Sequence, residues 1–370
     1  MSSVPFGYLD VGPGGPLGIG ELMPGVRNLL DYLGVRAGER VLVLADASTD
    51  ALALSAIVAG AAYRDAEPHV LTIPPVSPGG SERPGLDPLT VAAYAEADAV
   101  ISCVWWAEVH TAELFFTVVP RHRARFVSLH MTATPAALAT GSRFPPDLFY
   151  VIKRRSLEVT AGAREIRVTT ARGTDVTFTD PRIDQDAGPM EPGMWRPWPL
   201  GGLNFYPGST EGVLVIEEST ITGVPAEPLR VHVRDNVVAD LEGDEAADQL
   251  RRFGPDGYYL RHAFIGLNPK VRLDGAPQFE REKHAGAFYL GIDGLADGRP
   301  DPSGPGFAHV DCQFDRPTIT VDGELMVDAG RLLLLDDPQV LEAAATYGEP
   351  GRLLDPNPRQ TLRPAHWQRR

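Results

Sequence analysis

Cysteine is nearly absent from this chain, because its 370 residues include only Cys103 and Cys312. Two cysteines make neither a disulfide framework nor a CxxC metal site, and both lie among apolar residues, where burial is the default. Long hydrophobic runs are also missing: no apolar stretch approaches about 18 residues, so we expect no membrane span. The stretch MSSVPFGYLD has no basic region followed by an apolar one, so we expect no secretory signal. These absences favour a soluble, cytoplasmic protein.

Positive charge is in short supply as well. The formal net charge of −15 at pH 7 argues against nucleic acid as a partner, because phosphate backbones are bound by basic patches. It argues equally against an anionic membrane surface. The hydrophobic fraction of 43% and the charged fraction of 22% are those of an ordinary globular protein. A chain of this length buries a full core, in two domains or one large one.

The first 150 or so residues alternate between helical and strand-like stretches. The stretch LLDYLGVRAGERVLVLAD predicts a helix that ends near Gly34 and a strand from Arg40 to Leu44. Further apolar strands follow in HVLTIP, AVISCVW and RARFVSLH, with helical stretches between them. This alternation predicts a doubly wound α/β domain with a mostly parallel sheet. No G-x-G-x-x-G follows the first strand, so a nucleotide cofactor is not supported.

The pattern changes near residue 155. The stretch REIRVTTARGTDVTFTD reads as a hairpin, and more short alternating strands follow, with one helix in GDEAADQLRRFGPDG. We therefore expect an α/β domain over residues 1–154 and a β-rich α+β domain over 155–370. The proline-rich stretch 183–209 and the tail after residue 336 read as loops. Stretch 183–209 would be either an interface arm or a pocket lid.

The stretch GFAHVDCQF carries an unusual pair for an apolar strand. His309, Asp311 and Gln313 would share one face, since residues two apart in a strand point the same way. Such a pair is a candidate for metal binding, but solvated or hydrogen-bonded pairs of this kind are common.

Three other histidines have settings that suit chemistry. His262, in YYLRHAFIGLNPKVRL, is either a core histidine bonded to a backbone carbonyl or a metal ligand. His110, in CVWWAEVHTAEL, follows an apolar strand, where α/β sheets place ligand-binding residues; the alternative is a histidine at the start of a helix. His130, in VSLHMT, also stands at a strand end.

Several motifs together resemble a known family. IGLNP, LGID and HVDCQFDRPTITVDGELMVDAG are similar to the C-terminal half of the dinuclear aminopeptidases T and S, and GERVLVLAD…AIVAGAAYRDAEPHV fits their α/β domain. The resemblance covers roughly residues 20–335. Those peptidases have a glutamate where this chain has His262, a second in the segment here written LNFYPGST, and a histidine near Phe288 and Tyr289. Most carboxylates of the two-metal site would be missing.

His262, His309 and Asp311 remain, and they resemble the dioxygenase branch of that superfamily, typified by 2,5-dihydroxypyridine 5,6-dioxygenase. Two histidines and one carboxylate form the triad of non-haem Fe(II) oxygenases. Both branches share the His-x-Asp motif, so the choice depends on His262. The resemblance implies an Fe(2+) cofactor, a homo-oligomer and a catalytic histidine from the N-terminal domain, for which His110 is our candidate and His130 the second.

The expected activity is thus extradiol-type cleavage of a dihydroxypyridine or similar aromatic by O2, in pyridine degradation. Three protein ligands leave three positions open, enough for two substrate donors and O2. The alternative is an aminopeptidase or amidohydrolase of the aminopeptidase T/S type, with a single zinc and a general base. Glu280 and Glu282, in a charged loop, are the candidate bases, although no spacing favours either. A binding protein that has lost catalysis is a third possibility.

Overall fold

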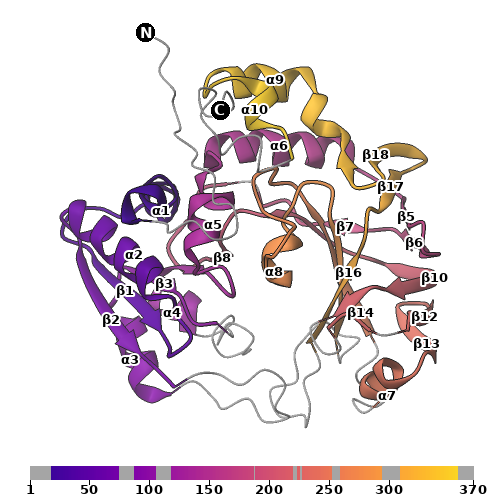
Figure 1. Cartoon of the computed structure of the whole chain (residues 1–370), viewed down its shortest axis with the longest axis horizontal. Coiled ribbons are helices and arrows are strands. Elements are labelled where there is room, and N and C mark those ends of the chain that lie inside the picture. Colours follow the sequence, from indigo (N-terminus) through magenta and orange to yellow (C-terminus); the bar gives the residue numbers. More distant parts are fainter. Residues whose placement is uncertain are drawn as a thin grey trace, which may run out of the picture.

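The computed structural model describes residues 18–74, 87–105, 118–186, 188–219, 223–225, 227–251, 259–293 and 309–356, with Asp293 and His309 described by their backbone alone. Within these residues the strands form a sheet of 5 strands and another of 14. The parallel sheet and its helices lie on the left of Figure 1, and the antiparallel sheet lies on the right. The molecule is therefore mixed α/β, with a parallel sheet and a large antiparallel one, as predicted.

Helices and strands alternate through the first half, as the apolar pattern predicts. The first helix ends at Leu33, and Gly34 follows with a φ of 66°, the left-handed conformation that glycine adopts most easily. Strands β2, β1, β3 and β4 pair in parallel, in that order. The elements are α1 (Ile19–Leu33), β1 (Arg40–Ala45), α2 (Ala51–Tyr63), β2 (Glu67–Thr72), α3 (Pro88–Glu96), β3 (Ala99–Ser102), α4 (Val119–His122), β4 (Arg125–Ser128), α5 (Pro135–Ala139), η3 (Gly141–Arg143) and α6 (Pro146–Val159).

The second half supplies the antiparallel sheet and the remaining helices. None of the helices in the described ranges is both long and apolar enough to cross a membrane. The elements are β5 (Glu165–Thr169), β6 (Asp175–Thr179), β7 (Arg182–Ile183), β8 (Trp195–Pro197), β9 (Gly202–Tyr206), β10 (Ser209–Ile216), β11 (Glu218–Ser219), β12 (Leu229–Arg234), β13 (Val237–Glu242), α7 (Glu245–Arg251), β14 (Tyr259–Gly266), α8 (Gln278–Arg281), β15 (Phe288–Asp293), β16 (His309–Phe314), β17 (Thr318–Val321), β18 (Glu324–Asp328), β19 (Arg331–Leu332), η5 (Leu333–Asp336), α9 (Pro338–Ala345) and α10 (Pro350–Leu353).

Strand β8 belongs to the parallel sheet although it comes from the second half. Trp195 of β8 pairs in parallel with Phe126 of β4. The stretch 183–209 also contains β9, so the prediction that it is loop-like was wrong. Its prolines are compatible with β8 because that strand lies at the edge of the sheet, where a missing backbone N–H breaks no ladder hydrogen bond.

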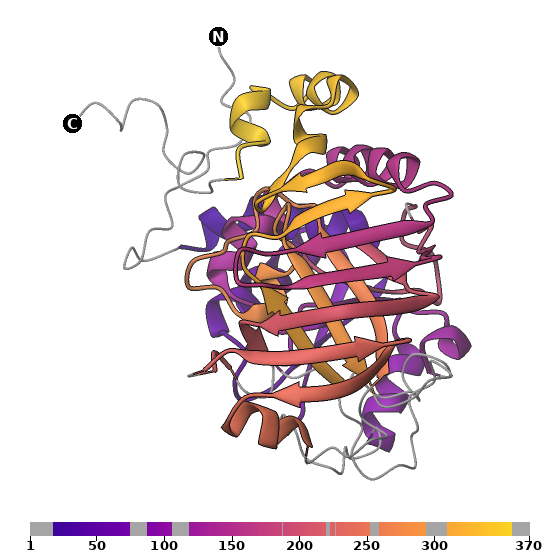
Figure 2. The same ribbon diagram turned by 90° about the vertical axis from the view of Figure 1, so that its right-hand side faces the viewer.

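The antiparallel sheet folds back on itself and encloses a core. In Figure 2 the strands β5, β6, β10, β12 and β13 run across the view, in front of β14, β15 and β16. Phe178 of β6 packs against Phe205 of β9 and Phe288 of β15, with ring centroids 5.2 and 6.0 Å apart. Alternate residues of β15 therefore point away from this core. Figure 1 shows α8 and the parallel half of the molecule on the side of β14 and β16 that faces away from β10, β12 and β13.

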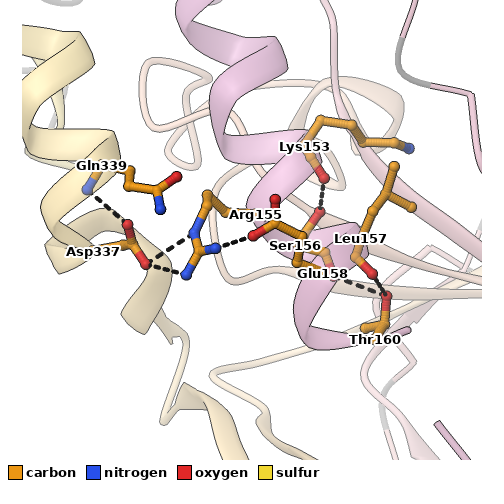
Figure 3. A network of polar contacts seen from close by, with 8 residues as sticks. All are labelled: Lys153, Arg155, Ser156, Leu157, Glu158, Thr160, Asp337 and Gln339. Atoms are coloured by element: carbon orange, nitrogen blue, oxygen red, sulfur yellow. Dashed lines mark hydrogen bonds and ion pairs between the residues drawn. The ribbon is translucent and has the colours of Figure 1, made fainter. Parts of the chain in front are cut away.

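Helices α9 and α10 contradict the prediction that the tail after residue 336 is loop-like. Asp337 caps α9 by accepting a hydrogen bond from the backbone N–H of Gln339, and it accepts two more from Arg155 of α6, at 2.8 and 3.0 Å (Figure 3). Burial alone would raise the pKa of Asp337, but these hydrogen bonds hold it below its ordinary value. An aspartate followed by proline is an ordinary helix start, so the sequence does carry a signal for this helix.

Candidate metal and substrate site

Three neighbouring strands, β14, β15 and β16, place His262 and Asp311 in one row. His262 pairs with Gly291 of β15, and Gly291 pairs in turn with Asp311 of β16. Residues that lie opposite each other in an antiparallel sheet point to the same face. Since neighbouring strands are about 4.8 Å apart, the two side chains project from positions about 10 Å apart, with only a glycine between them.

A β-bulge in β14 determines that His262 faces this row rather than the core. Leu260 pairs with Ile292, whereas His262 pairs with Gly291, so Arg261 is one extra residue on β14. Without it, His262 would point into the core together with Leu260, because side chains alternate along a strand. Bulges beside active sites commonly redirect a side chain in this way.

Gly291 leaves the space that the His262 ring occupies. A Cβ atom on Gly291 would lie 2.6 Å from Cε1 and 3.0 Å from Nδ1 of His262, inside the contact distance of about 3.5 Å. The imidazole therefore extends over β15, in the direction of Asp311. Glycine inside a strand often marks such a close approach.

Asp311 is buried and is held from two sides. The Tyr289 hydroxyl donates a hydrogen bond to Oδ1 of Asp311, and Nε2 of Gln278 donates to the Asp311 backbone carbonyl at 2.7 Å. The Tyr289 ring also lies 5.7 Å from that of His262, between centroids. A buried carboxylate is stable only when it has hydrogen-bond partners. The Tyr289 hydroxyl is such a partner, and it fixes the position of Oδ1.

The segment that contains α8 is buried, so the prediction of a charged loop was wrong. Glu280 is fully buried, and its carboxylate accepts hydrogen bonds from Arg272 at 2.8 and 3.0 Å. Glu282 lies 3.0 Å from Nζ of Lys283. Burial lowers the pKa of Lys283, while the carboxylates of Glu282, Glu280 and Asp311 act against that shift. Oppositely charged residues can be buried when they pair with each other. A charge-rich stretch of sequence does not reveal such pairing, and therefore reads as an exposed loop.

His130 reaches the same segment from the parallel half of the molecule. It follows β4, is buried, and has its ring centroid 4.6 Å from that of Phe279 on α8. The residue before Phe279 is Gln278, which bonds to Asp311. His110 and the side chain of His309 lie outside the described residues, so their roles stay predictions.

The row continues on the other side of His262. Strand β9 pairs with β14, and Tyr206 of β9 pairs with Arg182 of β7. The Tyr206 ring centroid is 6.3 Å from that of His262, and the guanidinium carbon of Arg182 lies 4.8 Å from the Tyr206 centroid. Arg182, Tyr206, His262 and Asp311 thus follow one another across the sheet.

Sequence reasoning missed Gly291, Tyr289 and Gln278. The glycine in FYLGID interrupts an otherwise apolar strand, and this could have indicated a close approach. Tyr289 and Gln278 had no comparable indication, because their contacts depend on strand register and on the placement of α8.

The fold resembles those of two solved proteins. The structure of 2,5-dihydroxypyridine dioxygenase from Pseudomonas putida KT2440 matches with a TM-score of 0.66 at 19% identity, covering 86% of this chain and 98% of that one. Wild-type AmpT from Thermus thermophilus matches with a TM-score of 0.55 at 13% identity, covering 85% of this chain and all of that one. At such identities the likeness shows the fold alone. No curated protein sequence matches this chain significantly.

The family model for 2,5-dihydroxypyridine 5,6-dioxygenase (NicX) matches residues 21–334. This span includes the strands of both sheets and the whole row from Arg182 to Asp311. It confirms the resemblance that the motifs around His262 and Asp311 indicate. The chain therefore belongs to the 2,5-dihydroxypyridine 5,6-dioxygenase family.

Proposed function

We propose that this protein is a ring-cleaving dioxygenase that holds one Fe(II) ion with His262, His309 and Asp311. The row in which Gly291 separates His262 from Asp311 carries the proposal. An imidazole and a carboxylate that project over a residue without a Cβ fit a divalent metal ion. His309, two residues before Asp311 on β16, is the proposed third ligand.

The donor set suits oxygen chemistry on a chelating substrate. When bound, iron would hold the hydroxylated ring and O2 next to each other and let electrons pass between them. Two neutral imidazoles and one carboxylate would leave the site with a single positive charge, which favours an anionic substrate. The protein's own contribution is to hold these groups: the bulge at Arg261 directs His262, and Tyr289 orients the Asp311 carboxylate.

Ring cleavage also needs a group that moves protons. We assign to His110 the task of taking the proton from the substrate hydroxyl and returning it later. His130 is the second candidate, and its contact with Phe279 on α8 supports a place near the Asp311 side of the site. Either histidine would come from the parallel half of the molecule and act on a substrate held by the antiparallel half.

The proposed reaction has the form of the family's named one. With 2,5-dihydroxypyridine, the bond between ring positions 5 and 6 breaks, and both atoms of O2 enter the product, N-formylmaleamate. No further oxidant or reductant is needed, since the product is the sum of the ring compound and O2. We also propose that the protein is cytoplasmic. We further propose that it forms a homo-oligomer, and light scattering on the purified protein would test this oligomeric state.

The alternative is a metal-dependent aminopeptidase or amidohydrolase. Its support is the likeness in fold to AmpT. A hydrolase needs a general base beside its metal-bound water. Glu280 accepts two hydrogen bonds from Arg272, and Glu282 is buried beside Lys283, so neither is well placed for this role.

Metal analysis of anaerobically purified protein, combined with oxygen uptake on adding 2,5-dihydroxypyridine, tests the proposal. We expect about one iron per chain and uptake that the His262→Ala variant abolishes. The Gln249→Ala variant, changed on the distant helix α7, serves as the control. The hydrolase would be favoured by three results together: zinc or two metals per chain, amide hydrolysis without oxygen, and no oxygen uptake with any hydroxypyridine.

A further inference from the structure

Arg182 is a charged side chain at the end of the row described above. It is exposed, and its guanidinium lies against the face of Tyr206. Within the described part of the chain, Tyr206 is its only side-chain partner, and no carboxylate pairs with it. Other arginines of this region do pair with carboxylates: Arg272 with Glu280, Arg281 with Glu218 and Arg196 with Asp186.

The position of Arg182 is fixed by the sheet. It pairs with Tyr206 across β7 and β9, and Tyr206 lies beside His262. The two centroid distances place the guanidinium within about 11 Å of the His262 ring. Stacking on an aromatic face limits the freedom of an arginine while leaving its N–H donors available for an anion.

From this arrangement we infer that Arg182 binds a carboxylate substituent of the ring that is cleaved. This deepens the proposed function and rests on it: the substrate class would be a hydroxylated pyridine or arene that bears a carboxylate. The hydroxyl donors would face His262 and Asp311, and the carboxylate would face Arg182. Tyr206, between them, offers its ring to the apolar part of the substrate.

Charge supports this choice of ligand. The chain carries a net charge of −15, so an anion gains little from the protein as a whole and needs a local positive group to bind. Arginine suits a carboxylate because its planar fork donates two parallel hydrogen bonds. A ring without a carboxylate, such as 2,5-dihydroxypyridine, would make no use of this group.

Two ligands that differ only in a carboxylate provide the test. Neither 6-hydroxynicotinate nor 2-hydroxypyridine has the second hydroxyl of the substrate, so we expect both to bind without being cleaved. Their affinities for the anaerobic, metal-loaded protein can be measured by isothermal titration calorimetry. We expect 6-hydroxynicotinate to bind at least about tenfold more tightly, because a hydrogen bond between charged groups contributes at least that much to the affinity. The Arg182→Gln variant should lose this preference, and Arg182→Lys should keep part of it.

Arg167→Gln is the matched control, because Arg167 is an exposed arginine of the same sheet that already pairs with Asp175. It should leave the preference unchanged. Equal binding of the two ligands, or a preference that survives in Arg182→Gln, overturns the inference. If neither ligand binds although 2,5-dihydroxypyridine drives oxygen uptake, the inference fails and the proposed function stands. If no ring compound binds or drives uptake, both fail.

Discussion

Adding one methyl group at Gly291 perturbs the His262 ring and little else. In a Gly291→Ala variant the new Cβ would lie 2.6 Å from Cε1 of His262, and carbon atoms in contact need about 3.5 Å. The ring must therefore move by about 1 Å. A displacement of that size at a catalytic centre costs on the order of a hundredfold in rate. The side chain is only partly buried, so we expect it to swing outward and the free energy of unfolding to fall by less than the ~1–3 kcal/mol of core overpacking.

The assay is kcat/KM for oxygen uptake, measured with iron content and the thermal unfolding midpoint of the same preparation. Gly351→Ala is the control, because a Cβ at Gly351 meets nothing within 4 Å. We expect the control to match the wild type in all three measurements. A Gly291→Ala protein with full iron content and unchanged kcat/KM would refute the idea that the gap over Gly291 positions a metal ligand.

Three further predictions follow from contacts elsewhere in the fold. Tyr289→Phe removes the hydrogen bond to Asp311, and we expect the iron affinity, measured against a chelator, to fall about 10- to 100-fold while the unfolding midpoint of the metal-free protein changes little. Burial lowers the pKa of Lys270 to about 7 and that of Lys153 to about 8. Between these pKa values and their ordinary value of about 10.5, the two lysines are protonated in the unfolded chain and neutral in the folded one. The free energy of unfolding, measured with urea, should therefore rise with pH over that range. The Lys153→Met variant should show a smaller rise. Asp337→Ala removes the cap of α9 and the pair with Arg155, and should lower the free energy of unfolding by about 1–3 kcal/mol without changing kcat/KM.

Each of these three has an outcome that contradicts it. An unchanged iron affinity in Tyr289→Phe would show that the phenol does not orient Asp311. A flat pH dependence in the wild type would mean that the buried lysines keep their ordinary pKa values. A loss of kcat/KM in Asp337→Ala at full folding would place the contact between α6 and α9 in the catalytic machinery.

The sequence predicted those features of the fold that local patterns determine. The alternation of apolar strands and helices, the helix end at Gly34 and the strand that carries Asp311 depend on neighbours in the chain, and the structure agrees with them. The row of the site depends on strand register instead. The extra residue Arg261 looks like any other strand residue, so no pattern could show that His262 faces Asp311 across Gly291.

The errors have a similar origin. Glu280 looks exposed because its segment is rich in charge, and only the approach of Arg272 makes its burial possible. Strand β8 is short and rich in proline, and it becomes a strand because β4 offers an open edge. The start of α9 is different, since the aspartate and proline at 337 and 338 are a local capping pattern that the sequence itself contains.

The place of β8 in the parallel sheet has a consequence for synthesis on the ribosome. The strand that covers the edge of β4 is residues 195–197, about seventy residues after β4 itself. Until that segment emerges, the nascent chain presents an unpaired edge, and such edges invite pairing with other chains. A fragment that stops at residue 154 keeps that edge open permanently. The first half of this protein therefore completes its sheet only after residues 195–197 of the second half have been translated.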